Sequence, residues 1–277
     1  MTGSAYPAGA CFFDVVRACL DASDPLEKVT LVNQIAQELA SGRLPAEDSG
    51  TAPNPIQAPG RPARPQLVPP RDLPQRGLGS DEGRAALLHA VTHIEFNAIN
   101  LALDAAYRFR AMPASFYADW ISVAVDEARH FTLLAQRLKE LGFDYGDFQA
   151  HNGLWEMAER TAHSCLARMA LVPRVLEARG LDVTPGMILR LRKLGDQRSA
   201  DILEIILSEE IRHVGIGSQW FAWCCQRDGL PPEPTFIELI GNVAKGSIRG
   251  PFNLPARYAA GFADSEMALI TALAQSK

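Results

Sequence analysis

The chain has 277 residues, of which 47% are hydrophobic and 21% charged, and its formal net charge is −5 at pH 7. This composition is typical of a soluble globular protein with a sizeable core, and the acidic balance argues against a general affinity for nucleic acid or anionic membranes. No apolar run approaches the ~20 residues that a membrane span requires, and the first residues lack the basic and apolar regions of a signal peptide. Five cysteines without a Cys-x-x-Cys pair agree with a reducing compartment, so we expect a cytoplasmic protein.

Residues 1–42 are expected to form an N-terminal helical appendage. Apolar positions recur at helical spacing between residues 11 and 41, and the break at Ser23-Asp24-Pro25 predicts two short helices. Residues 43–80 differ in character, because nine prolines interrupt any helical pattern. We expect an extended, polyproline-type strap there, which is locally basic at Arg61, Arg64, Arg71 and Arg76.

Residues 81–226 carry helical patterns long enough for a four-helix bundle. The expected helices span about 81–110, 115–142, 153–180 and 196–226. Between the third and the fourth, the run Gly180-Leu-Asp-Val-Thr-Pro-Gly186 predicts a break, followed by a short helical piece that ends near Gly195. The remaining residues, 227–277, are expected to pack on the bundle as a C-terminal extension.

One pattern occurs twice within this bundle: a glutamate, and about thirty residues later a Glu-x-x-His. The two copies are Glu95 with Glu127-Ala-Arg-His130, and Glu177 with Glu210-Ile-Arg-His213. Residues i and i+3 share one face of a helix, so each Glu-x-x-His places a carboxylate beside an imidazole. Four carboxylates and two imidazoles that converge inside a four-helix bundle are the ligands of a dinuclear iron or manganese site.

The neighbours of these residues argue for burial. Positions three, four and seven residues from Glu95, Glu127 and Glu210 are mainly apolar, and a carboxylate on such a face is strongly unfavourable unless it is paired or bound to metal. Glu177 has polar neighbours, so a salt bridge to an arginine remains an alternative for it. A lone histidine is usually a core residue, but two in matched positions indicate that His130 binds metal together with its counterpart in the second copy.

An acidic residue, Asp126 or Glu209, precedes the glutamate of each Glu-x-x-His. A metal-bound imidazole usually donates its second N–H to a carboxylate, so we predict that these two acids accept from the two histidines. The alternative is a pair of exposed acids on the helix rims. His89 and His93 are interpreted as structural or as supports of the site, whereas His151 and His163 stay unassigned.

Residues 81–226 resemble the ferritin-like di-metal carboxylate superfamily in the two copies of this pattern. Further stretches are similar to an uncharacterised bacterial family known only as a domain of unknown function: His93-Ile-Glu95, 126–131, Tyr145-Gly-Asp147, 177–183 and Trp220-Phe221. That family is similar to the tRNA hydroxylase that oxidises an isopentenyl-type adenosine side chain. The resemblance implies an all-α, ferritin-like bundle with a metal site, but it says little about the substrate, because function on this scaffold depends on the pocket.

Ligation by carboxylates and two imidazoles favours two iron ions, or manganese, over zinc or copper. We therefore expect an O2-dependent di-iron oxidoreductase of the hydroxylase type, whose organic substrate is a small molecule or is carried on a tRNA. The sequence holds neither a dinucleotide fingerprint nor a cysteine-rich cluster motif, so an electron-donor protein is an expected partner; a homodimer is compatible with the pattern. The alternative is an iron-sequestering ferroxidase without an organic substrate. The strap arginines, with Arg249 and Arg257, would seat phosphates or form surface salt bridges.

Overall fold

A computed structural model describes residues 11–47, 50–244 and 248–275. Residues 1–10, on which the expectation about a signal peptide rests, lie outside these ranges. The chain divides into two compact units, Met1–Trp155 and Glu156–Lys277. Within the described residues all regular structure is helical, as predicted, apart from one isolated parallel bridge between Leu67 and Ala150. None of the helices described is both long and apolar enough to cross a membrane.

Each unit is built from helices of very different lengths. The first contains α1 (Phe12–Asp21), α2 (Pro25–Ala40), the 3-10 turn η1 (Pro70–Asp72), α3 (Asp81–Arg108) and α4 (Ala114–Glu140), and α5 (Gly153–Arg160) holds the boundary. The second contains α6 (Cys165–Leu171), the π-helix η2 (Val172–Glu177), α7 (Ala178–Lys193), α8 (Gln197–Asp228), α9 (Pro232–Leu239), the π-helix η3 (Ile240–Ala244), α10 (Leu254–Ala259) and α11 (Asp264–Gln275).

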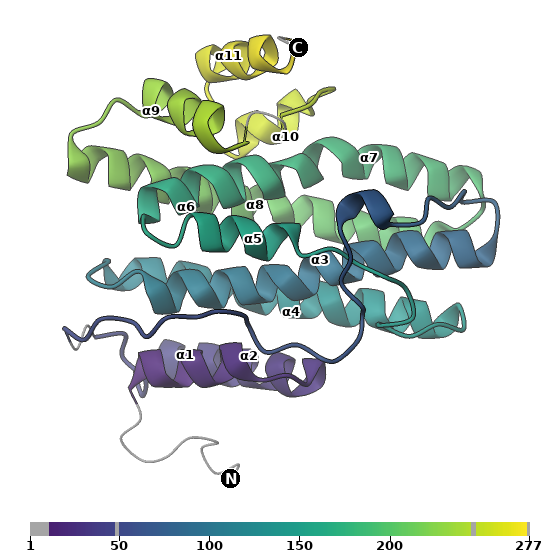
Figure 1. The fold of residues 1–277 in the computed structure, drawn as a ribbon, viewed down its shortest axis with the longest axis horizontal. Coiled ribbons are helices and arrows are strands. Elements are labelled where there is room, and N and C mark those ends of the chain that lie inside the picture. Colours follow the sequence, from purple (N-terminus) through teal and green to yellow (C-terminus); the bar gives the residue numbers. More distant parts are fainter. Residues whose placement is uncertain (1–10, 48–49, 245–247, 276–277) are drawn as a thin grey trace. The chain divides into compact units, whose positions relative to one another are not determined.

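The long helices α3 and α4 form the centre of the first unit. Ser80 begins α3, because its hydroxyl accepts from the backbone N–H of Gly83 at 3.1 Å. A five-residue connection separates the end of α3 at Arg108 from the start of α4 at Ala114, so the two helices pack side by side as an antiparallel hairpin (Figure 1). Both helices agree with the predicted spans to within a few residues.

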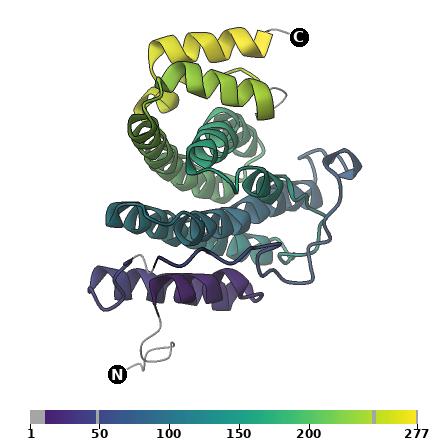
Figure 2. The ribbon, with the colours of Figure 1, turned by 60° about the vertical axis from the view of Figure 1, so that its left-hand side comes forward.

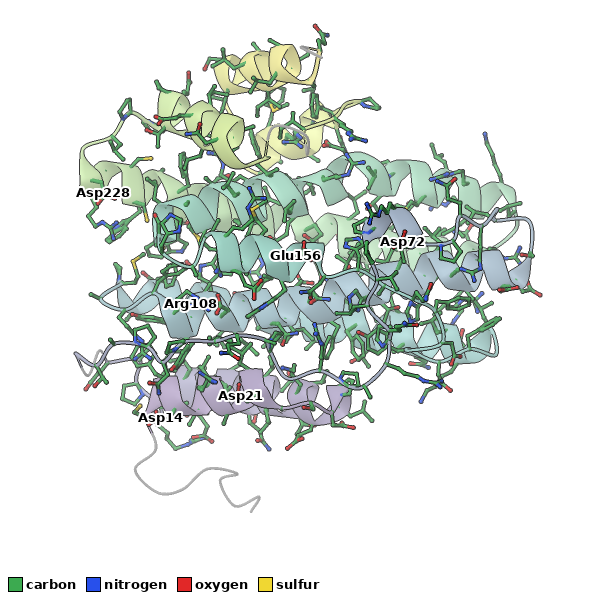
Figure 3. The ribbon with its side chains drawn as sticks, in the orientation of Figure 1. Asp14, Asp21, Asp72, Arg108, Glu156 and Asp228 are labelled. Atoms are coloured by element: carbon green, nitrogen blue, oxygen red, sulfur yellow. The ribbon has the colours of Figure 1, made fainter. Side chains whose placement is uncertain are left out.

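The N-terminal pair of helices packs against this hairpin, α1 on α3 and α2 on α4. The predicted break is confirmed: Asp24 accepts from two backbone N–H groups of α2, and Pro25 occupies its first turn. Asp14 and Asp21 mark the exposed side of α1 (Figure 3). The fully buried Lys28 donates to the carbonyl oxygens of Cys19 and Leu20 and to Asn100 Oδ1, at 2.7–3.2 Å, and so joins α1, α2 and α3.

The proline-rich segment between α2 and α3 is extended, as predicted, apart from η1. Its backbone is fixed at separate points of the first unit: Gly60 N–H donates to the carbonyl of Leu20 at 2.8 Å, and Val68 N–H to that of Ala150 at 2.8 Å. Gly60 passes so close to α1 that an added Cβ would lie 2.1 Å from the carbonyl oxygen of Asp21. Arg76 pairs with Glu82 at 3.3 Å, which favours the salt-bridging alternative for this strap arginine.

In the second unit, the predicted third helix is wrong in two places. The chain turns between α5 and α6 instead of continuing as one helix over 153–180, because Ser164 caps a new helix by accepting from Ala167 N–H at 3.2 Å. The expected break at 180–186 is also absent, since α7 runs without interruption through Gly180 and Pro185. Composition at these positions favours a turn, but tertiary contacts decide the conformation.

Two prolines within this helical region are accommodated by contacts from elsewhere in the second unit. Pro185 offers no N–H to the carbonyl of Leu181, and the Asn253 side chain donates to that carbonyl instead, at 3.1 Å. Pro173 lies in η2 against α8, where an added Cβ on Gly217 would meet its ring at 2.3 Å. The small residue on α8 therefore allows the proline-containing turn to approach closely.

A buried ion pair joins the C-terminal helices to η2 within the second unit. Arg174 donates to Glu266 at 2.6 Å, and both side chains are at most 6% exposed. The guanidinium also lies 4.2–4.8 Å from the ring centres of Phe221, Phe236 and Phe262, a cation–π arrangement on three sides. Helices α9 and α11 run beside each other; they are the yellow-green and yellow helices at the top of Figure 2.

Candidate metal centre

The α3–α4 hairpin places three of the predicted ligands together in the first unit. Glu95 and Glu127 each lie 16 positions from Ala111 in the connection (111 − 95 and 127 − 111), so they occupy the same level of the two antiparallel helices. His130 Nδ1 lies 3.2 Å from a carboxylate oxygen of Glu95 and 3.3 Å from one of Glu127. One ligand atom from each of these residues lies within 4.8 Å of the others. We call these three residues the first Glu/His set.

Because these side chains are buried, charges on them are energetically unfavourable when no cation is bound. All three side chains are at most 5% exposed. Burial, with the neighbouring carboxylate of Glu127, raises the pKa of Glu95 well above its ordinary value. Burial also opposes a charge on His130, but its hydrogen bonds to Glu127 and Glu95 outweigh that effect and raise its pKa to about 11. Without metal the set therefore retains protons at neutral pH, and a divalent cation bound by the same atoms would replace them.

The second Glu/His set, Glu177, Glu210 and His213, belongs to the second unit. His213 Nδ1 lies 3.3 Å from Glu210 Oε1, the distance found between His130 and Glu127, and His213 is fully buried. Glu177 is half-buried at the end of η2, which packs against α8. Arg174, three positions before it in the sequence, pairs with Glu266. That both sets bind the same pair of ions remains a prediction of the sequence repeat.

The acids that precede the two Glu-x-x-His motifs are half-buried. Asp126 and Glu209 each take part in a polar or electrostatic interaction, and neither is fully exposed on a helix rim. Their predicted role as acceptors of the second imidazole N–H of His130 and His213 stays a prediction.

A hydrogen-bonded network beside the first set was not predicted from the sequence. His93 Nδ1 lies 2.9 Å from the hydroxyl oxygen of Tyr145, and its Nε2 lies 3.2 Å from the carbonyl oxygen of His151 and 3.0 Å from the side-chain nitrogen of Asn97. The Tyr145 ring packs against Phe96 and Phe131, whose ring centres are 5.7 and 5.2 Å away. Because these phenylalanines directly follow Glu95 and His130 in sequence, the network supports the helix turns that carry the first set.

His89 belongs to the same aromatic cluster and is fully buried. Its Nε2 accepts from the backbone N–H of Gly146 at 2.9 Å, which places the ring proton on Nδ1. Burial lowers the pKa of His89 to about 4, and likewise the pKa of His93. Both residues are therefore neutral imidazoles at physiological pH. His151 accepts from Gly153 N–H, and His163 is exposed.

Acid is expected to destabilise the first unit through His89. The unfolded chain binds a proton near pH 6.5, whereas the folded residue does so only near pH 4, so stability is lost as the pH falls through that window. The shift corresponds to at most about 3 kcal/mol. In urea titrations at pH 7 and pH 4.5, His89→Gln should lose less stability between the two values than wild type. The exposed control His163→Gln should match wild type, and a His89→Gln protein with the full wild-type pH dependence would contradict this account.

The model of the family described as "Protein of unknown function (DUF455)" matches residues 21–268, which include both Glu/His sets. The chain belongs to the DUF455 family. A relative described as an uncharacterized protein of Haemophilus influenzae is 43% identical over 265 residues, which cover 92% of each chain. No solved structure matches. The predicted relation to an uncharacterised bacterial family is thus confirmed. Neither the description of the family nor that of the relative names an activity.

Proposed function

We propose that this DUF455 protein is an O2-dependent di-iron oxidoreductase on a ferritin-like bundle, in which the two Glu/His sets bind two iron ions. The observation that carries the proposal is the repeated geometry. Each unit holds a Glu-x-x-His whose imidazole Nδ1 lies 3.3 Å from the carboxylate, with a buried histidine in both cases. Oxygen and nitrogen donors in this proportion suit iron or manganese.

Glu95, Glu127 and His130 from the first unit, with Glu177, Glu210 and His213 from the second, would hold the two ions. When bound, such a pair of ions supplies the redox chemistry with dioxygen by which an organic substrate is hydroxylated. The protein's contribution is to hold the ligands in place and to exclude water.

The first set is suited to these tasks. Glu127 and His130 are fully buried, so bulk water does not compete for their ligand atoms. The rings of Phe96 and Phe131, 5.5 Å apart, form an apolar wall beside the ligand turns. Because the set carries extra protons when it holds no cation, binding of iron should release protons into solution.

To test this, metal is first removed from the protein with a chelator. The protein is then loaded with ferrous iron under anaerobic conditions and exposed to O2. We expect two iron ions per chain, and an optical change on exposure to O2 that needs both. Oxygen consumption should be slow with a chemical reductant alone and faster with the substrate, because substrate completes the pocket.

Two outcomes would contradict the proposal. A chain that binds neither iron nor manganese would exclude the metal centre. Oxidation of iron far beyond two equivalents per chain, with a ferric core retained, would replace the oxygenase by the iron-sequestering ferroxidase.

A further inference from the structure

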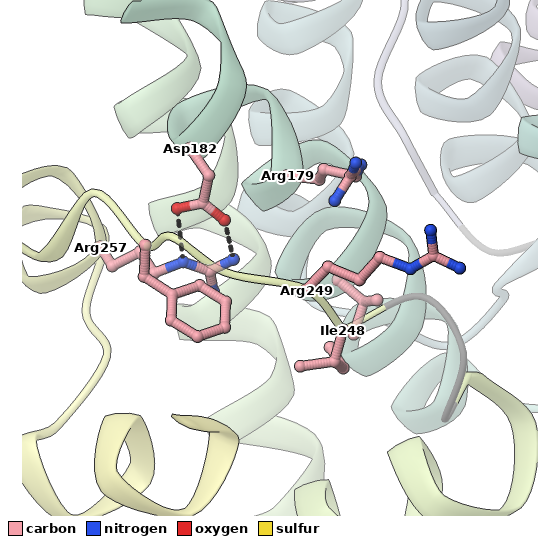
Figure 4. Close-up of a pocket in the computed structure, with 7 residues that line it drawn as sticks. Arg179, Asp182, Ile248, Arg249 and Arg257 are labelled. Atoms are coloured by element: carbon pink, nitrogen blue, oxygen red, sulfur yellow. Dashed lines mark hydrogen bonds and ion pairs between the residues drawn. The ribbon is translucent and has the colours of Figure 1, made fainter. Parts of the chain in front are cut away.

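A shallow surface depression, which we call the hollow, lies on the second unit beside the turn that carries Glu177; it is open to solvent and encloses no cavity. It lies where the start of α7 meets the segment 248–257 (Figure 4). Its polar lining consists of three arginines and a single carboxylate: Arg179, Arg249, Arg257 and Asp182. A surface that gathers guanidinium groups in excess of acids is suited to an anion.

One of the three arginines is already neutralised. Arg257 donates to both carboxylate oxygens of Asp182, at 2.6 and 3.0 Å, and each side chain is only 2% exposed. Asp182 also accepts from the backbone N–H of Asn253 at 2.9 Å, and the ring centre of Phe252 lies 5.0 Å from the Arg257 guanidinium. This buried pair forms a fixed side of the hollow that carries no net charge.

The other two arginines, Arg179 and Arg249, are exposed, and no carboxylate of the described residues pairs with either. Figure 4 shows both to one side of the Asp182–Arg257 pair. The hollow therefore presents two positive charges that the lining does not compensate. The two charges come from separate segments of the chain, α7 and residues 248–257, and both line the hollow.

We propose that this hollow binds a phosphoryl group through Arg179 and Arg249. A phosphate monoester carries a charge of about −1.5 to −2 near neutral pH, which matches two guanidinium groups better than a single carboxylate does. The planar fork of N–H groups on arginine fits phosphate oxygens in a bidentate manner. Phe252 adds an apolar wall on which the organic part of a phosphate ester can rest. The site belongs to the second unit, and neither arginine is among the predicted metal ligands, although Arg179 lies two positions after Glu177.

Two sources offer the same chemistry: a small phosphate ester or the backbone of an RNA strand. Full-length protein from which metal has been removed should be titrated at low ionic strength with inorganic phosphate, a nucleoside monophosphate and a short single-stranded RNA. Calorimetry and 31P NMR measure the binding. We expect saturable binding of at least one probe. Arg179→Gln and Arg249→Gln should each weaken it at least about tenfold, the loss of one charge-assisted contact.

The matched control is Arg190→Gln, an exposed arginine further along α7 that does not line the hollow and should bind as wild type does. Tighter binding of the monophosphate than of RNA, per phosphate, would assign a small ester. Salt-dependent binding of RNA far tighter than that of the monophosphate would assign a nucleic-acid backbone. Absence of saturable binding to all three probes, or wild-type affinity in both lining variants, would overturn the site. Failure of iron binding would leave this result unaffected.

Discussion

Glu127→Gln is expected to abolish the binding of at least one metal ion per chain and, with it, the stability that bound metal gives the wild type. Without metal the substitution removes a carboxylate that helps to hold a proton on His130, so the buried imidazole should become neutral in the variant. With metal present only the wild type gains stability by mass action, about 2.7 kcal/mol at a hundredfold excess over Kd. For a chain of this length that gain raises Tm by about 5–10 °C.

Metal analysis and melting curves, with and without chelator, measure both parts of this prediction. Glu140→Ala is the matched control, because Glu140 lies on the same helix but is exposed, and it should bind metal and melt as wild type does. A Glu127→Gln protein that binds the full metal complement would remove Glu127 from the centre. If wild type melts at one temperature under both conditions, the centre itself is excluded.

Arg174→Met is expected to lower the free energy of unfolding by about 3–5 kcal/mol, because it leaves the buried carboxylate of Glu266 without its counter-ion. It also removes the cation from among three phenyl rings. Urea unfolding measures the loss. The double variant Arg174→Met, Glu266→Met should regain a large part of it, since two apolar side chains can replace a buried ion pair.

An exposed ion pair in the same unit provides the control for this prediction. Arg192 and Glu204 are 2.7 Å apart, but their side chains are 40% and 44% exposed. Arg192→Met should therefore change stability by no more than about 1 kcal/mol. Equal losses for Arg174→Met and Arg192→Met would show that the phenylalanine-lined pair contributes no more than a surface contact.

Local sequence patterns predicted much of this fold. The proline-rich strap, the N-terminal pair and the α3–α4 hairpin follow from composition, caps and periodicity, which act within a few residues. The first Glu/His set was predictable for the same reason. A hairpin with a short connection brings positions equidistant from the turn to one level, so Glu95 and Glu127 meet wherever both helices form.

Prediction was wrong where distant residues decide the backbone. Pro185 remains inside α7 because Asn253, 68 positions later (253 − 185), donates to the carbonyl that the proline leaves without an N–H. The π-helix that ends at Glu177 is likewise invisible to periodicity, since it depends on the close fit of Pro173 against Gly217. Such π-helical turns are frequent at functional sites, and this one carries a predicted ligand.

The strap also bears on the order in which the first unit can be completed during synthesis. The α3–α4 hairpin needs only neighbouring sequence, but Val68 donates to Ala150, which is made 82 residues later (150 − 68). Contacts between such distant positions form late, because the closure of a long loop costs entropy before any contact compensates for it. The Gly60 end of the strap can reach α1 as soon as it is made, whereas the part around Val68 cannot take its native place on a nascent chain until residues near Ala150 have left the ribosome.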